Sequence, residues 1–154
     1  MIFMLFFGEG LIQRVQGTFY PSMHVSLGIT ILVLSVVRLV WRLKNPPPAL
    51  PNTMKPWEVT VSHITHWAFY VLMIGMPLTG MMDISRAALR NVDLLQASTF
   101  GLFNVPTLPN LLGLGGAHSL GAFAGKILVI LHVGAALKHQ FWDKDGLLRR
   151  MLPH

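Results

Sequence analysis

Cysteine is absent from the sequence. Disulfides, iron–sulfur clusters and thiolate ligation of haem are therefore excluded, and histidine and methionine remain as the soft or borderline metal ligands. Charge is also scarce, because only 12% of the 154 residues are charged, whereas a soluble domain carries about 25%. Hydrophobic residues make up 53% and the mean hydropathy is +0.56. This balance predicts a membrane protein.

Missing motifs narrow the chemistry further. The sequence has no HExxH motif and no carboxylate at the expected depth of its intramembrane histidines, which argues against a zinc site. It has no GxSxG motif, which argues against nucleophilic hydrolysis. The net charge of +6 could suggest nucleic acid, but the basic residues lie beside apolar runs rather than in a patch with aromatics. We therefore expect no nucleic-acid partner.

Three hydrophobic runs are long enough to cross a bilayer, which takes about 20 helical residues. They are Ser22–Leu43, Val59–Met82 and Gly116–Trp142. A proline-broken loop follows the first run, a longer loop rich in Gly, Pro and Asn follows the second, and a polar tail at 143–154 follows the third. The runs predict an all-α membrane protein with one transmembrane helix bundle over residues 1–154.

A short apolar stub precedes these runs at residues 1–10, MIFMLFFGEG. Its hydrophobic part is too short to span a bilayer, and it lacks the basic region and the cleavage site of a secretory signal. We interpret it as the end of a truncated first helix, so that the bundle has three complete spans plus an N-terminal stub.

Basic residues are distributed unevenly between the two sides of the predicted bundle. Eight lie in or beside the proline-rich loop and the C-terminal tail, and three lie on the other side, namely Arg14, Arg86 and Arg90. The positive-inside rule then places the C-terminus in the cytoplasm.

The third run carries two histidines on one helical face. His118 and His132 are 14 residues apart, which leaves them about 40° apart around a helix and roughly 21 Å apart along its axis. This spacing suggests two metal-centred cofactors stacked across the membrane. His24 begins the first run and is expected at the level of His118. Haem iron in electron-transfer proteins is commonly held by two imidazoles from different helices, so these histidines are the candidate haem ligands.

Small residues lie near the candidate ligands. Gly28, Gly121 and Gly125 have no side chains, so they would leave room beside the helices for a macrocycle. Close helix packing explains these glycines equally well. The alternative for the histidines is that they only form hydrogen bonds between helices or lie at interfaces, as we expect for His63.

Three stretches of the sequence resemble the bacterial cytochrome b561 family: MHVSLGITILVLSVVRLVWRLKNPPP, HITHWAFYVLMIGMPLTG and HSLGAFAGKILVILHVGAALKHQFWDKDGLLRRM. The resemblance implies a four-helix bundle with two b haems in the bacterial inner membrane. Its outer haem would use His24 and His118, and its inner haem would use His132 with a histidine of the first helix. This sequence contains no such histidine, which we attribute to truncation. In a native chain of this length the expected substitute is His66, although we predict it to lie closer to the surface than His132.

The resemblance also implies an activity, the oxidation of periplasmic superoxide and the reduction of ubiquinone in the membrane. His139, two turns along from His132, is our candidate for the quinone side, with His66 in support. Both also lie near the headgroup boundary, where a plain interfacial role fits as well. Arg86 and Arg90 on the outer side would attract a superoxide anion, or would merely solubilise their loop.

Two other functions stay open at this point. The chain could be a haem b electron-transfer subunit for a partner dehydrogenase or hydrogenase, or a haem-free membrane scaffold. The expected partners are membrane lipid, quinone, and either superoxide or a redox partner protein.

Overall fold

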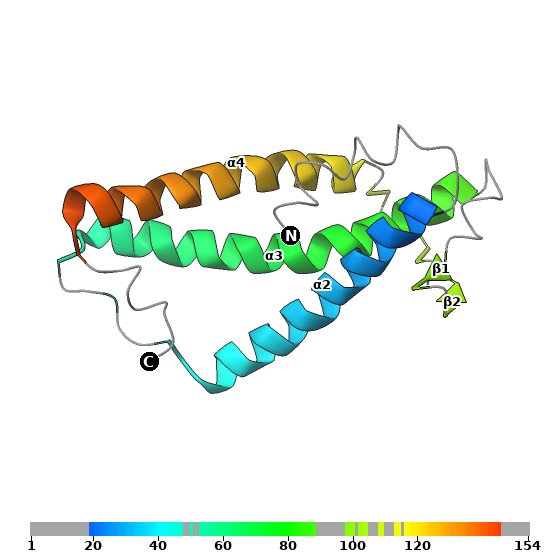
Figure 1. Cartoon of the computed structure of the whole chain (residues 1–154), viewed down its shortest axis with the longest axis horizontal. Helices are drawn as coiled ribbons and strands as arrows, with labels where there is room; N and C mark the ends of the chain where they lie inside the picture. The colour runs from blue at the N-terminus through cyan, green and yellow to red at the C-terminus, as the bar shows by residue number, and fades with distance from the viewer. Residues whose placement is uncertain are drawn as a thin grey trace.

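The computed structural model describes residues 19–47, 50, 53–88, 98–100, 102–104, 108–109, 113–114 and 116–145. Its helices are α2 (Phe19–Lys44), α3 (Pro56–Ala88) and α4 (Ala117–Lys138), and α4 continues into a π-helical turn, η2 (His139–Asp143) (Figure 1). The predicted stub at 1–10, most of the tail, and the side chains of Arg14, Arg86 and Arg90 lie outside the described residues.

All three helices are long and apolar enough to cross a membrane. Large hydrophobic side chains cover their outer faces, and Leu34, Val71 and Leu131 are 62%, 69% and 64% exposed. An apolar surface of this extent is unfavourable in water, whereas lipid solvates it and the helices satisfy their own backbone groups. The prediction of an all-α membrane bundle is confirmed.

Local sequence explains where α3 begins. Pro56 occupies the first turn, where its missing N–H would have no helical partner in any case. Glu58 reaches back, and its Oε2 accepts a hydrogen bond from the backbone N–H of Lys55 at 2.9 Å, which is one half of a capping box. The helix then continues through Pro77 to Ala88.

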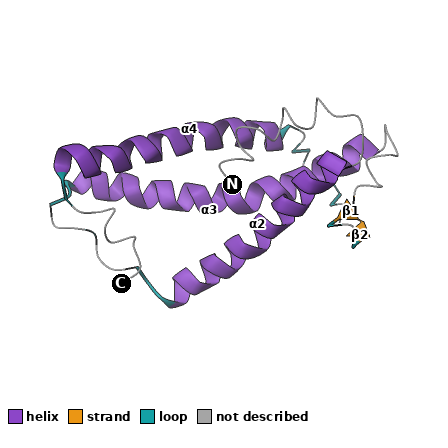
Figure 2. Cartoon of the chain, viewed as in Figure 1, coloured by secondary structure: helices purple, strands orange, loops and turns teal. Residues whose placement is uncertain are grey.

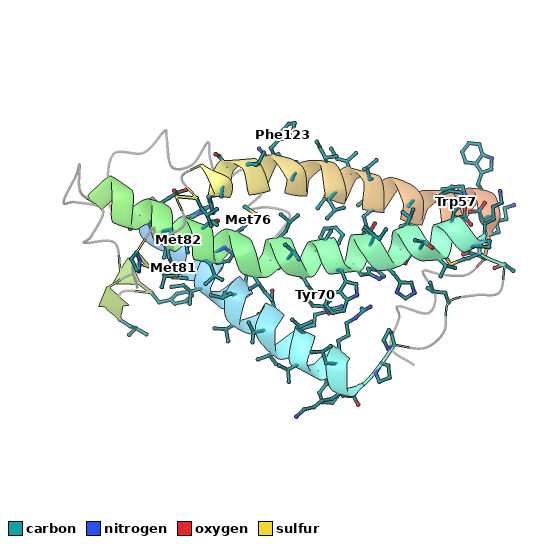
Figure 3. All side chains as sticks on the ribbon, turned by 180° about the vertical axis from the view of Figure 1, so that it is seen from behind. Trp57, Tyr70, Met76, Met81, Met82 and Phe123 are labelled. Carbon is teal, nitrogen blue, oxygen red and sulfur yellow. The ribbon has the colours of Figure 1, made fainter. Side chains whose placement is uncertain are left out.

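The central element of the bundle is α3, because α2 and α4 both pack against it (Figure 1). α4 runs antiparallel along α3, whereas α2 lies against α3 near its own start and diverges toward its end. The core between α3 and α4 contains Ala122 and Val129, with Phe69 and Met76 packed against them. Met76 lies between the two helices, whereas Phe123 points away from the bundle (Figure 3).

The long loop between α3 and α4 contains a strand pair that the sequence did not predict. β1 (Ser98–Thr99) and β2 (Phe103–Asn104) are antiparallel (Figure 2). The backbone N–H of Phe100 donates to Oγ of Ser26 at 2.9 Å, which attaches the hairpin to α2. Two-residue strands have no periodic pattern, so the sequence offers no signal for them. We call this end of the bundle the His24 end, and the opposite end the His139 end.

Candidate functional site

His24 of α2 and His118 of α4 face each other at the His24 end of the bundle. Their ring centroids are 5.9 Å apart and their planes are inclined by 72°. Both helices pack against α3. The structure thus brings together the two histidines that the sequence placed at equal depth.

The imidazole of His118 is oriented by the backbone of α3. Its Nδ1 lies 2.8 Å from the carbonyl oxygen of Met76. A carbonyl can only accept, so Nδ1 carries the proton and donates it, which leaves the lone pair on Nε2. This hydrogen bond therefore selects the tautomer that is suited to bind a metal through Nε2.

The same ring lies directly against Gly80 of α3. A Cβ at Gly80 would stand 3.1 Å from Nδ1 and 3.2 Å from Cε1 of His118, which is closer than most real contacts of a Cβ. Sequence reasoning missed Gly80. The segment PLTG contains it, but only the register of α3 against α4 shows that this glycine is the one beneath His118.

His24 has a buried nitrogen without a partner in the described part of the chain. Its Nδ1 is the only buried side-chain nitrogen or oxygen without a hydrogen bond among the described residues. No hydrogen bond joins His24 to His118 within the same part of the chain. A hydrogen-bonded pair of histidines therefore does not explain this arrangement. One turn along, a Cβ at Gly28 would meet nothing within 4 Å, so the space beside His24 is open.

A second pair of histidines lies deeper in the bundle. His66 of α3 and His132 of α4 have ring centroids 5.9 Å apart with planes inclined by 67°, and Phe69 places its ring 5.2 Å from that of His132. Because α3 begins at Pro56, His66 stands ten residues into the helix, about 15 Å from its start. The predicted depth of His66 in the membrane stays a prediction.

The remaining predicted residues have mixed environments. A Cβ at Gly121 would lie 3.0 Å from Cγ of Met76, so this glycine permits close packing of α4 on α3. Gly125 is buried in the core, and His63 is exposed, one turn before His66. Arg86 and Arg90 cannot be assigned to a site, because their side chains lie outside the described residues.

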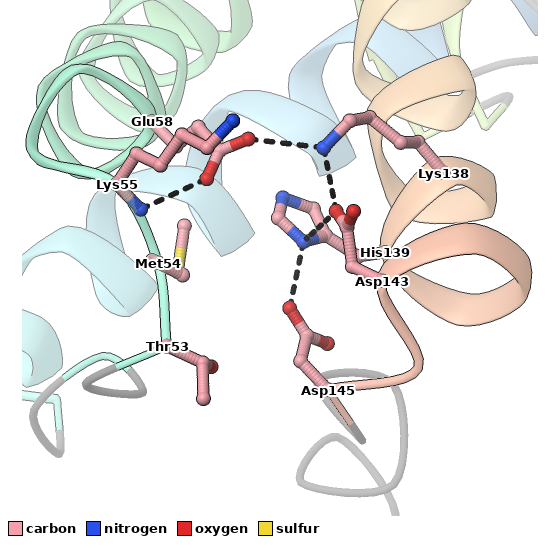
Figure 4. A pocket seen from close by; sticks show the side chains of 8 residues that line it. All are labelled: Thr53, Met54, Lys55, Glu58, Lys138, His139, Asp143 and Asp145. Atoms are coloured by element: carbon pink, nitrogen blue, oxygen red, sulfur yellow. Dashed lines mark hydrogen bonds and ion pairs between the residues drawn. The ribbon is translucent and has the colours of Figure 1, made fainter.

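A polar pocket occupies the His139 end, with a volume of about 240 Å³ (Figure 4). His139 is 7% exposed, and its Nδ1 lies 2.7 Å from Oδ2 of Asp145 and 3.1 Å from Oδ2 of Asp143. Lys138 binds Oε1 of Glu58 at 3.0 Å and also pairs with Asp143. The pocket is lined by Thr53, Met54, Lys55, Glu58, Lys138, His139, Asp143 and Asp145.

This pocket offers ligand atoms for a cation, but a side-chain ammonium group already lies between two of the carboxylates. Glu58, His139 and Asp143 place candidate ligand atoms within 4.8 Å of one another. The ammonium group of Lys138 bridges the two carboxylates of this trio. A metal ion would have to displace that ammonium, so the arrangement favours a hydrogen-bonding and proton-exchanging site.

The two histidine pairs, His24 with His118 and His66 with His132, by contrast fit a metal-centred group. An imidazole nitrogen binds a transition metal at about 2 Å, so two imidazoles on one ion hold their ring centres roughly 6 Å apart. Both pairs have a spacing of 5.9 Å. The donor set of two imidazoles, the open space at Gly28 and the His24 Nδ1 that has no partner among the described residues all suit a haem iron.

Comparisons with known proteins identify the family of this chain. Residues 1–154 match the family described as prokaryotic cytochrome b561. Cytochrome b561 homolog 2 of Escherichia coli (strain K12) is 34% identical over 137 residues, which cover 86% of this chain and 70% of that relative. The probable superoxide oxidase CybB of Yersinia pestis is 28% identical over 159 residues, covering 94% of this chain and 81% of that protein. Cytochrome b561 homolog 1 of Escherichia coli (strain K12) is 26% identical over 135 residues, with coverages of 84% and 73%.

Proposed function

The chain belongs to the prokaryotic cytochrome b561 family, and from this premise we propose that it oxidises superoxide at the His24 end of the bundle and reduces ubiquinone at the His139 end. Members of this family are membrane cytochromes that bind b-type haem and transfer electrons. The finer assignment draws on a relative that is named as a probable superoxide oxidase.

One observation carries the proposal: the pairing of His24 with His118. These two residues would hold a haem b, and when bound the haem supplies one-electron redox chemistry. The carbonyl of Met76 holds the proton on Nδ1 of His118 and so keeps Nε2 free. A hydrogen bond at this position also raises the basicity of the ligand nitrogen.

The pocket at the His139 end supports the quinone half of the reaction. Reduction of ubiquinone to ubiquinol consumes two electrons, from two superoxide anions that leave as dioxygen, and two protons. Asp145 accepts a hydrogen bond from Nδ1 of His139, and the other ring nitrogen faces the pocket (Figure 4). His139 and Lys138 are donors suited to quinone oxygens, and the adjoining carboxylates can exchange protons with water.

Spectroscopy and rapid mixing test this proposal on the purified full chain. We expect a reduced-minus-oxidised spectrum with the α-band of low-spin haem b, reduction of that haem by superoxide, and one ubiquinol for every two superoxide anions. His118→Ala should abolish reduction by superoxide, because the only ligand from α4 at this level is then lost. Added superoxide dismutase should suppress the signal in the wild type.

Other outcomes would identify the alternative functions. A haem spectrum without reduction by superoxide would contradict the proposed activity and favour an electron-transfer subunit of a larger enzyme. A chain that binds no haem under reconstitution would contradict the proposal entirely and leave a membrane scaffold.

A further inference from the structure

We propose that Asp145 is a positioning residue for proton transfer to ubiquinone, because it holds the Nδ1 proton of His139 and so makes Nε2 the ring nitrogen that exchanges protons. This inference deepens the proposed function and rests on it, since ubiquinone reduction at the His139 end consumes the protons. The residue that selects the transferring nitrogen thus lies outside the membrane-spanning helices, just after η2.

The end of η2 places Asp145 against the His139 ring. Lys144 has a left-handed backbone with φ of 51°, and its N–H donates to the carbonyl oxygen of His139. This reversal turns Asp145 back, and its own backbone N–H lies 3.4 Å from the same carbonyl oxygen. Oδ2 of Asp145 then accepts the Nδ1 proton at 2.7 Å, and the Asp145 side chain is only 4% exposed. Backbone and side chain together fix the pair.

Asp143 also lies near the ring, but it is the poorer acceptor. Its Oδ2 is 3.1 Å from Nδ1 of His139, and the same oxygen binds the ammonium group of Lys138. The Asp143 side chain is 34% exposed, so water competes for it more than for that of Asp145. The single proton of Nδ1 therefore goes to the shorter and less solvated contact, which is Asp145.

The hydrogen bond to Asp145 determines what the other ring nitrogen can do. A carboxylate only accepts, so Nδ1 keeps its proton in both charge states of the ring. Nε2 faces the pocket (Figure 4), and it presents a lone pair when His139 is neutral and an N–H when His139 is an imidazolium. The ring can therefore give a proton to a quinone oxygen and later take one from water without turning.

The charges that face His139 leave room for one more positive charge. Among the described residues that line the pocket, three carboxylates stand against two ammonium groups. They are Glu58 of α3, Asp143 of η2 and Asp145, against Lys138 of α4 and Lys55 just before α3. A proton on Nε2 of His139 makes these charges equal in number.

The proposed step moves one proton for each electron. As ubiquinone takes up an electron, the Nε2–H bond of His139 breaks and an O–H bond forms on the quinone oxygen. The ring becomes neutral with its Nδ1 proton still shared with Asp145, and water in the pocket restores the proton on Nε2. Two such cycles supply the two protons of ubiquinol. The carboxylate orients the imidazole and stays ionised, as the aspartate of a serine-protease triad does.

The test follows re-oxidation of the full chain by a short-chain ubiquinone at a series of pH values. The protein is first reduced with a stoichiometric amount of dithionite, so this half-reaction does not depend on superoxide. In Asp145→Asn we expect the rate to fall about tenfold or more at neutral pH. The pH at which the rate is half-maximal should also move lower, because the imidazolium has lost a facing carboxylate.

Two further readouts separate positioning from a merely structural role. The quinone concentration for half-maximal rate should change little in Asp145→Asn, because Asp145 acts through His139. Asp145→Glu keeps the carboxylate and should restore most of the rate. The matched control is Lys144→Asn, since Lys144 is exposed, adjoins Asp145 and does not line the pocket. Asparagine tolerates its left-handed backbone, and this variant should keep the pH profile of the wild type.

Nitrogen-15 NMR of the histidine-labelled wild type covers the case in which Asp145→Asn does not fold. Comparison with His139→Gln identifies the His139 signals, and we expect the neutral ring to carry its proton on Nδ1. A neutral ring protonated on Nε2, a wild-type pH profile in Asp145→Asn, or an equal or larger shift in Asp143→Asn would each overturn the inference.

Failure of the proposed function looks different from failure of the inference. A haem that ubiquinone re-oxidises with the expected dependence on Asp145, but that superoxide does not reduce, would contradict the proposed activity alone. A reduced wild-type protein that ubiquinone does not re-oxidise at any pH would contradict both.

Discussion

At the scale of single residues, the position of His118 in the candidate site at the His24 end depends on contacts with the backbone of α3. Gly80 leaves the room in which the His118 ring lies, and the Met76 carbonyl one turn earlier fixes the proton of that ring. The imidazole is thus held from one side by α3 and faces His24 on the other. A ligand that is oriented in this way loses little freedom when it binds iron.

We predict that Gly80→Ala weakens haem binding at the proposed His24–His118 site, whereas Gly75→Ala does not. The added methyl group at Gly80 would stand 3.1 Å from Nδ1 of His118, whereas a methyl group at Gly75 would meet nothing within 4 Å. Overpacking of this kind costs about 1–3 kcal/mol, which corresponds to roughly a 5- to 150-fold loss of haem affinity. Haem titration of the apoprotein measures the loss, and equal affinities in the two variants would contradict our account of His118.

The sequence identified some of these residues and could not identify others, for a physical reason. The depth of His24 and His118 follows from counting along one helix at a time, so the sequence could place both at one level. The contact of Gly80 with His118 and that of His66 with His132 depend on the register between two helices, which no count along a single helix supplies. The ligand roles of His24, His118 and His132 stay predictions until haem is measured.

At the scale of whole elements, α3 and α4 are joined at the His139 end by charges as well as by packing. Lys138 of α4 binds Glu58 of α3, and Glu58 also accepts the backbone N–H of Lys55 at the start of α3. The same lysine pairs with Asp143 in η2. The sequence predicted both helices from their long apolar runs, but not this connection, because its partners are 80 residues apart in the chain.

We expect Lys138→Met to lower the thermal midpoint of the detergent-solubilised protein by several degrees. The substitution leaves Glu58, which is 8% exposed, and Asp143 without their shared cation, and removing the cation from a buried carboxylate such as that of Glu58 is destabilising. Lys44→Met is the matched control, since Lys44 ends α2 on its exposed side. Equal midpoints for the two variants would show that the ion pair does not join the helices.

At the scale of the whole molecule, the proposed reaction has a direction across the membrane. The two histidine pairs lie at successive levels of one bundle, with the hairpin at the His24 end and the polar pocket at the other. Superoxide is an anion that crosses lipid poorly, so only one face of the membrane can supply it to the His24 end. The three spans were predictable from hydrophobicity alone, whereas their sidedness depends on the basic residues outside the spans.

We predict that superoxide generated in the bulk reduces the haem in right-side-out membrane vesicles and not in inverted ones. This prediction assumes the orientation that eight basic residues against three favour, with the C-terminal tail and the His139 end in the cytoplasm and the His24 end in the periplasm. Trypsin should then cleave the tail after Arg149 or Arg150 in inverted vesicles alone, which checks the orientation independently of haem. Equal reduction in both preparations would contradict a superoxide site on one side, and cleavage of the tail in right-side-out vesicles would reverse the assigned orientation.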